Sequence, residues 1–210
     1  MDDLHFAAAR KLEQRRLYAV GGIILYVLAS LAELSVQAYA LSNQGSVSPE
    51  AIQIADAIDL SFPLSFYLSA VVVGMWIYQA HTNVRMAGYT WPDTTPGMAV
   101  GWFFIPFANL AMPFMAMRDL WHASHGAGSS PGTTPPLLAA WWGCFLSGGI
   151  LMTLSNVAAS ANPDGFSKTA LFMLDAGIVL RLASAWCLFD IRRIVTRAQS
   201  RLVSVAETFA

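Results

Sequence analysis

The sequence predicts an all-α, polytopic membrane protein: a four-helix transmembrane bundle with an additional helical segment that prolines interrupt. Charged residues make up only 12% of the 210 residues and apolar residues make up 56%, whereas about a quarter of a soluble globular domain is charged. The apolar residues also gather in runs of the roughly 20 residues that a helix needs to cross a bilayer. Both cysteines, Cys144 and Cys187, lie inside such runs, which excludes a disulfide scaffold.

Four runs are expected to cross the membrane, and they cover residues 17–41, 60–80, 136–160 and 169–191. A fifth stretch, 98–117, is also long enough, but Pro106, Asn109 and Pro113 interrupt it. Proline removes a backbone donor and kinks or stops a helix. Hydropathy alone therefore does not decide whether this stretch crosses the membrane. The distribution of the lysine and arginine residues is the remaining evidence.

The distribution of positive charge favours a 98–117 stretch that enters and returns on one side. Ten lysine and arginine residues then share one side, only Lys168 lies on the other, and Arg181 lies inside a span; a full crossing splits them six against five. Because cytoplasmic loops carry the excess of lysine and arginine, we expect four crossings, both termini in the cytoplasm, and 98–117 as a re-entrant or interfacial segment. Five crossings are the main alternative. The ten residues are Arg10, Lys11, Arg15, Arg16, Arg85, Arg118, Arg192, Arg193, Arg197 and Arg201.

The regions beside the spans are expected to be helical as well, within a single membrane domain that covers residues 1–210. Residues 2–16 and 192–207 are predicted to be cytoplasmic helices, and the second is basic and amphipathic, as in helices that lie on anionic lipid. Ser48, Pro49 and Glu50 predict a short helix ahead of the second span. The amino terminus lacks the pattern of a cleavable signal peptide, and 126–136 is expected to be a loop.

The most distinctive motif lies between residues 76 and 124. It joins an A-x-x-N-x-R segment (80–85), a proline–glycine pair (96–97), a segment with glycine, tryptophan, proline and asparagine (101–113) and an R-x-x-W-x-A-S segment (118–124). In these residues the chain resembles the bacterial membrane family catalogued as domain of unknown function 4328. The resemblance implies a fold and a membrane location and no catalytic role. The candidate residues for binding a partner are Asn83, Arg85, Gly101, Trp102, Pro106, Asn109, Pro113, Arg118 and Trp121.

Two interpretations of the 98–117 segment stay open. Pro106 and Pro113 would leave two half-helices, with the amide of Asn109 between them to satisfy freed carbonyl groups at membrane depth. This arrangement predicts a re-entrant hairpin that lines a cavity. The alternative is an amphipathic helix that lies flat under the bundle and packs the cytoplasmic ends of the spans.

Three ionisable residues, Glu33, Asp175 and Arg181, fall inside predicted spans, where a charge is costly unless it is paired or hydrated. All three are expected in the outer half of the membrane. Asp175 is six residues from Arg181 and faces another side of the helix, so Glu33 is the expected ion-pair partner of Arg181. Gln37 and Asn156 extend this polar group. We interpret it either as a buried ion pair that fixes helix packing or as a polar pocket that binds a small ligand or cation.

No metal site and no cofactor are expected. In the run Asp119, His122 and His125, steps of three residues turn the first and last side chains about 120° apart, so they do not converge on one ion. No P-loop, dinucleotide fingerprint or nucleophile motif occurs. A net charge of −1 gives no reason to expect nucleic acid as a partner.

The predicted function is that of a non-enzymatic integral protein of the bacterial inner membrane, which docks a partner protein or assembles with its own copies. The dense motif at the cytoplasmic face, beside basic helices at both termini, is the basis of this hypothesis. The alternative is a small channel or transporter that uses Glu33, Asp175 and Arg181 as a polar site in the outer half of the membrane.

Overall fold

The computed structural model describes residues 2–43, 48–88, 94–126, 133–161 and 167–208, and among these it contains helices and no strand. The predicted all-α fold class is therefore confirmed. The elements are α1 (Asp2–Ser42), α2 (Pro49–Met86), α3 (Pro96–Gly101), the 3₁₀ turns η1 (Trp102–Phe104) and η2 (Ala108–Leu110), α4 (Met112–Ser124), α5 (Pro136–Ser160) and α6 (Lys168–Thr208).

Four helices of the described chain are long and apolar enough to cross a membrane, as predicted for a multi-pass membrane protein. The apolar stretches are Arg10–Ser42 of α1, Pro49–Met86 of α2, Pro136–Ser160 of α5 and Lys168–Arg201 of α6. The fifth stretch, 98–117, is divided among α3, η1, η2 and α4, because the backbone turns around Pro106 instead of continuing as one helix.

Helices α1, α2 and α6 are longer than a membrane is thick. At 1.5 Å per residue, the 41 residues of α1 and of α6 extend about 60 Å, twice the hydrocarbon thickness of about 30 Å. The expected helix 2–16 runs on into the first span. The expected short helix ahead of the second span leads into it without a break: α2 begins at Pro49, where Ser48 Oγ accepts a hydrogen bond from the N–H of Ala51 at 3.3 Å, and continues past Pro63.

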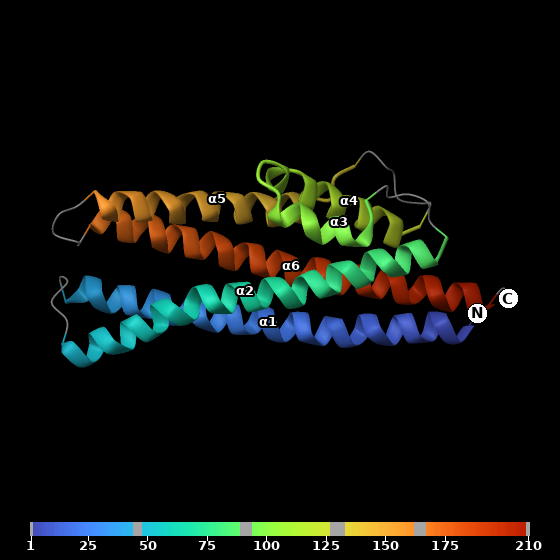
Figure 1. Cartoon of the computed structure of the whole chain (residues 1–210), viewed down its shortest axis with the longest axis horizontal. Helices are drawn as coiled ribbons and strands as arrows, with labels where there is room; N and C mark the ends of the chain where they lie inside the picture. The colour runs from blue at the N-terminus through green and yellow to red at the C-terminus, as the bar shows by residue number, and fades with distance from the viewer. Residues whose placement is uncertain (1, 44–47, 89–93, 127–132, 162–166, 209–210) are drawn as a thin grey trace.

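Helix α1 pairs with α2, and α5 pairs with α6, as two antiparallel helix pairs (Figure 1). Small residues let the backbones in each pair approach closely, which is a usual mode of helix packing in membranes. A Cβ atom on Gly22 would lie 3.1 Å from the Cα atom of Ser69 in α2. A Cβ atom on Gly148 would lie 2.9 Å from the carbonyl oxygen of Gly177 in α6. A side chain at Gly148 would therefore force a helix backbone to shift, and one at Gly22 would need the neighbouring helix to give by a few tenths of an ångström.

The two helix pairs are joined at the end of the bundle where both chain termini lie (Figure 1), here called the terminal end. The indole N–H of Trp76 in α2 donates to Thr196 Oγ1 in α6 at 3.2 Å. The amide nitrogen of Gln199 in α6 donates to the carbonyl oxygen of Ala80 at 3.1 Å and to Ser124 Oγ in α4 at 3.0 Å. These buried hydrogen bonds connect α2, α4 and α6.

The chain from α3 to α4 forms a compact unit, the 96–124 hairpin, on the side of the bundle at the terminal end (Figure 1). Thr95 caps α3, since its hydroxyl accepts a hydrogen bond from the N–H of Met98 at 3.2 Å. The indole N–H of Trp142 in α5 donates to the carbonyl oxygen of Leu110 at 2.9 Å. Both ends of the hairpin face the terminal end, so this segment is not a fifth spanning helix.

Candidate functional site

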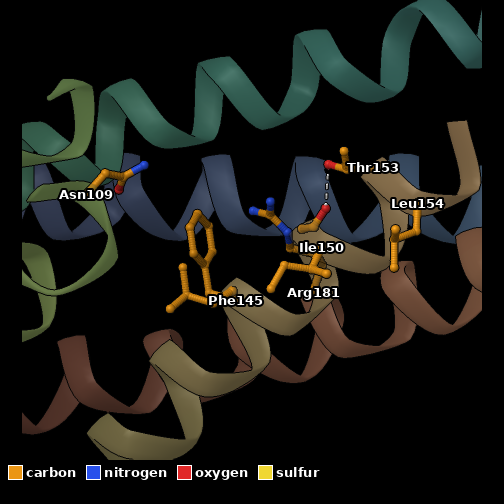
Figure 2. Close-up of a pocket in the computed structure, with 8 residues that line it drawn as sticks. Asn109, Phe145, Ile150, Thr153, Leu154 and Arg181 are labelled. Carbon is orange, nitrogen blue, oxygen red and sulfur yellow. Dashed lines mark hydrogen bonds between the residues drawn. The ribbon is translucent and has the colours of Figure 1, made fainter. Parts of the chain in front are cut away.

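A pocket of about 400 Å³ lies beside α5, between the 96–124 hairpin and the middle of the bundle (Figure 2). Its volume lies at the low end of the range of small-molecule sites, about 300–1,000 Å³, and it is open along much of its wall. Two of the predicted candidates meet here: Asn109 comes from the hairpin and Arg181 from α6, with the ring of Phe145 between them. The lining residues are Asn109, Phe145, Leu146, Gly149, Ile150, Thr153, Leu154 and Arg181.

Arg181 lies at the middle of the length of α5. Its side chain packs against Gly148 and Gly149, near the midpoint of the 25-residue helix. A Cβ atom on Gly149 would lie 2.8 Å from Arg181 Nη2, and one on Gly148 would lie 3.0 Å from Arg181 Cγ. The glycine pair thus forms a slot that holds the guanidinium group at mid-span, where a charge is most costly.

The guanidinium group of Arg181 contacts aromatic rings. Its Cζ atom lies 4.0 Å from the ring centre of Phe145 and 5.1 Å from that of Phe66, which are cation–π distances. Its Nε and Nη1 atoms are buried and have no hydrogen-bond partner in the described part of the chain. Because a guanidinium stays charged and carries five N–H donors, the pocket wall presents a cation that has no carboxylate partner among the described residues.

The predicted ion pair between Glu33 and Arg181 is wrong. The ion pairs within the described ranges involve neither residue, and Glu33 Oε1 instead accepts a hydrogen bond from Gln37 Nε2 at 2.8 Å. The reason is geometric. The slot in α5 turns the guanidinium towards Phe145. Glu33 lies nearer the end of the bundle away from the chain termini, nine residues before Ser42 at the end of α1.

Glu33 belongs to a separate acidic group. It is buried, and the carboxyl groups of Asp59 in α2 and Asp175 in α6 are near enough to interact with it. Gln37 is buried beside it, whereas Asn156 is exposed on α5. Asp59 was not predicted as a candidate, because it lies just ahead of the predicted second span, 60–80, whereas α2 continues through it from Pro49 to Met86. Within the described residues, no group of three His, Cys, Asp or Glu side chains is arranged to hold a metal ion.

Phe107 forms a sharp turn at the tip of the 96–124 hairpin. Its φ of 63° and ψ of −44° lie in a region that large side chains rarely adopt. The N–H of Ala108 donates to the carbonyl oxygen of Pro106 at 2.8 Å, which closes a three-residue γ-turn. The turn leaves Phe104 80% exposed and Phe107 87% exposed. Two phenyl rings therefore project from a fixed backbone.

The motif residues on α2 and α4 lie outside the pocket. Asn83 and Arg85 are in the last turns of α2, where Asn83 Oδ1 accepts a hydrogen bond from a side chain of the same helix at 2.8 Å and Arg85 is exposed. On α4, Arg118 pairs with Asp119 at 3.6 Å, and the ring of Trp121 stacks on that of a neighbouring histidine. These contacts of Asn83, Arg118 and Trp121 are thus with residues close to them in the sequence.

The remaining motif residues shape the 96–124 hairpin. Gly101 and Trp102 lie where α3 passes into η1, and Pro106 lies in the turn at the tip. Pro113 is buried in the first turn of α4, where its missing N–H leaves no helical hydrogen bond unmade. Asn109, whose Oδ1 atom is buried without a hydrogen-bond partner among the described residues, is the member of this motif that lines the pocket.

Sequence reasoning missed the groups that surround Arg181, namely Phe66, Phe145 and the pair Gly148 and Gly149. The adjacent glycines in the middle of a span were the available signal, because small residues in a membrane helix mark a close approach. The two phenylalanines gave no signal, since hydropathy does not distinguish a ring that covers an arginine from a ring that faces lipid.

The family model described as Domain of unknown function (DUF4328) matches residues 43–199, which is more than half of the chain. The match confirms the resemblance that the 76–124 motif indicates. All pocket-lining residues fall inside the matched range, whereas Glu33 and Gln37 precede it. No curated protein and no solved structure matches the chain.

Proposed function

Since the chain belongs to the DUF4328 family, a domain of unknown function, its own residues have to indicate its role, and we propose that it is a membrane-embedded binding protein without enzymatic activity. Its ligand occupies the pocket beside α5. Arg181 holds the ligand, and Asn109 places the 96–124 hairpin at the end of the pocket.

The observation that carries this proposal is the guanidinium group of Arg181 at the pocket wall. Two of its nitrogen atoms are buried without a hydrogen-bond partner among the described residues. A charged side chain at mid-span is costly unless it is paired or hydrated, and it is a functional-site candidate for that reason. The slot formed by Gly148 and Gly149 supports a specific role, because it keeps the charged group in one place.

The lining of the pocket supports binding and not catalysis. Its polar side chains are the guanidinium of Arg181, the amide of Asn109 and the hydroxyl of Thr153, which already donates to the carbonyl oxygen of Gly149 at 2.9 Å. None of these groups is a general acid or base near neutral pH, and the hydroxyl has no base beside it in the lining. The alternative of a channel or transporter that uses Glu33 stays a prediction.

Protein purified from its native membrane in mild detergent is expected to carry a small molecule that the Arg181→Gln variant lacks. Gly149→Leu is expected to lose the molecule too, since its side chain would occupy the slot of the guanidinium. Native mass spectrometry measures the bound mass. Gly143→Leu is the matched control, because a Cβ atom on Gly143 meets nothing within 4 Å. Identical spectra for the wild type and Arg181→Gln would contradict the proposed function.

In this proposal the protein lies in a bacterial inner membrane, with the terminal end in the cytoplasm. Both chain termini lie at this end (Figure 1). The end of α2 with Arg85 and the last part of α6, which carries Arg192 and further arginines, lie there as well, whereas Lys168 begins α6 at the other end. The excess of positive charge at the terminal end supports this orientation.

Labelled cysteines at the two ends of α5 test the orientation. In a variant with Cys144 and Cys187 replaced by alanine, a cysteine at Thr134 is expected to react only from the cytoplasmic side and one at Ser160 only from the periplasmic side. Both positions are exposed. The measurement is labelling by a membrane-impermeant maleimide in intact cells and in inverted vesicles. Reaction of Thr134→Cys from outside the cell would reverse the proposed orientation.

The 96–124 hairpin is proposed to enter the cytoplasmic leaflet as a re-entrant element whose partner is lipid. The hydrogen bond from Trp142 to Leu110 holds its tip beside the second turn of α5. The exposed rings of Phe104 and Phe107 suit contact with acyl chains. In lipid, apolar surfaces gain little from covering each other, so exposed rings at this depth do not need a protein partner.

A spin label on Phe107→Cys, in the variant without native cysteines, is expected to collide more often with oxygen than with a water-soluble nickel complex. The reason is that oxygen concentrates in the hydrocarbon and the complex in water. A label on Lys11→Cys, at an exposed position of α1, should show the opposite preference. Disulfide crosslinking of Phe107→Cys between two copies would instead indicate self-assembly at the tip and would contradict lipid as its partner.

A further inference from the structure

We infer that the ligand of this pocket is an amphiphile with one carboxylate group and a long apolar chain, which enters sideways from the bilayer. The inference rests on the proposed function of the pocket and names the chemical class of its ligand. Arg181 binds the carboxylate, and the chain lies along the face of α5 that carries Ile150 and Leu154.

The side of the pocket formed by α5 faces lipid. Ile150 is 60% exposed and Leu154 is 46% exposed, and both line the pocket. Exposed apolar side chains in a spanning helix contact acyl chains, so the pocket is reached from the hydrocarbon without a passage through water. A long apolar chain that moves from the lipid to this position stays in an apolar environment, so its transfer contributes little binding free energy. The affinity therefore depends on the polar group of the ligand.

The charge of Arg181 selects a carboxylate over a neutral acceptor. An ester or a ketone would accept hydrogen bonds from the guanidinium but would leave its positive charge uncompensated. A carboxylate supplies the opposite charge and accepts two parallel hydrogen bonds from the planar guanidinium fork. The guanidinium offers two such forks, Nε with Nη2 and Nη1 with Nη2, and each contains a nitrogen atom that has no hydrogen-bond partner among the described residues.

The depth of Arg181 selects a simple carboxylic acid over a phospholipid. Arg181 packs against the midpoint of α5, which places it about 15 Å from either membrane surface, given a hydrocarbon core of about 30 Å. The head group of a phospholipid stays at the surface and carries a charge that is costly at mid-span. A monocarboxylic acid crosses the hydrocarbon in its neutral form, so it can reach this depth.

Binding of oleate and of methyl oleate tests the inference, because the two differ in charge and share the same chain. Protein in phosphatidylcholine nanodiscs is titrated with each compound, and bound molecules are counted by native mass spectrometry. Oleate is expected to bind roughly tenfold or more tightly than methyl oleate. Arg181→Gln is expected to weaken oleate binding by a similar factor and to weaken methyl oleate binding much less, since the ester loses hydrogen bonds but no ion pair.

A second variant keeps the test decisive if Arg181→Gln does not fold. Ile150→Trp places a bulky ring in the lining of the pocket and is expected to weaken binding of both compounds. Val157→Trp, at an exposed position of the same helix that does not line the pocket, is expected to leave both unchanged. This pair separates occupation of the pocket from partition into the nanodisc lipid.

The outcomes distinguish the ligand class from the proposed function. Equal binding of oleate and methyl oleate, with both weakened by Ile150→Trp, overturns the carboxylate and leaves the binding function standing. Failure of both compounds to bind, while native protein still carries a molecule that depends on Arg181, overturns the amphiphile class alone. Failure in both experiments overturns the proposed function as well.

Discussion

Replacement of Gly177 by leucine is expected to lower the free energy of unfolding by about 3 kcal/mol, because it forces apart two helix backbones. A Cβ atom on Gly177 would lie 2.7 Å from Met152 Cγ and 3.0 Å from the carbonyl oxygen of Gly148. The methionine side chain can move, but the carbonyl belongs to the backbone of α5, so relief requires the two helices to separate. Their separation would also open the slot for Arg181.

Unfolding in mixed micelles measures this effect, with helical circular dichroism followed as the denaturing detergent is increased. The control is Gly143→Leu, which makes the same chemical change in α5 at an exposed position with nothing within 4 Å. It is expected to change the free energy of unfolding by less than about 0.5 kcal/mol. Similar losses in the two variants would mean that the close approach of α5 and α6 does not stabilise the bundle.

Replacement of Trp76 by alanine is expected to lower the free energy of unfolding by about 3–5 kcal/mol, the usual range for a large buried side chain. Trp76 is 0% exposed in the core at the terminal end. Its indole N–H donates to Thr196 Oγ1 at 3.2 Å, so the substitution removes packing and also leaves a buried hydroxyl without this donor.

The same unfolding measurement, with Trp186→Ala as the control, tests this prediction. Trp186 lies on α6 and is 69% exposed, so its loss creates no cavity. Trp76→Phe separates the contribution of packing from that of the hydrogen bond, because it keeps most of the buried ring and removes the indole N–H. Equal stability of Trp76→Ala and Trp186→Ala would show that the terminal end does not depend on this core.

The membrane-spanning helices were predictable because each forms from one continuous segment whose side chains suit the hydrocarbon around it. A run of about 20 apolar residues is long enough to cross lipid by itself, and the asymmetry of lysine and arginine favoured an even number of crossings. Pro106 likewise predicted a break in 98–117, since proline acts on its own backbone. The helices beside the spans were predictable as well. Residues 2–16 and 192–207 were expected to be helical, and they continue the spans within α1 and α6, each of which has 41 residues.

The site was less predictable because it depends on how helices rotate and slide against each other. Arg181 and Asn109 were both predicted as candidates, but for different sites, and the sequence contains no direct signal that they share one pocket. The contact between Gly148 and Gly177 sets the register of α5 on α6. That register places Arg181 against Phe145, and spacing within a single helix cannot predict it.

Helix α5 is shorter than the other three long helices at the terminal end, and the 96–124 hairpin takes its place there. At the terminal end, α1, α2 and α6 extend beyond the first residue of α5 (Figure 1). Without a fourth element, the core between these three helices would be exposed to the cytosol in the proposed orientation. Met117 and Leu120 of α4 are fully buried in the same core as Trp76, and they close the open side. Damage to this segment would therefore expose the core at the terminal end and favour aggregation.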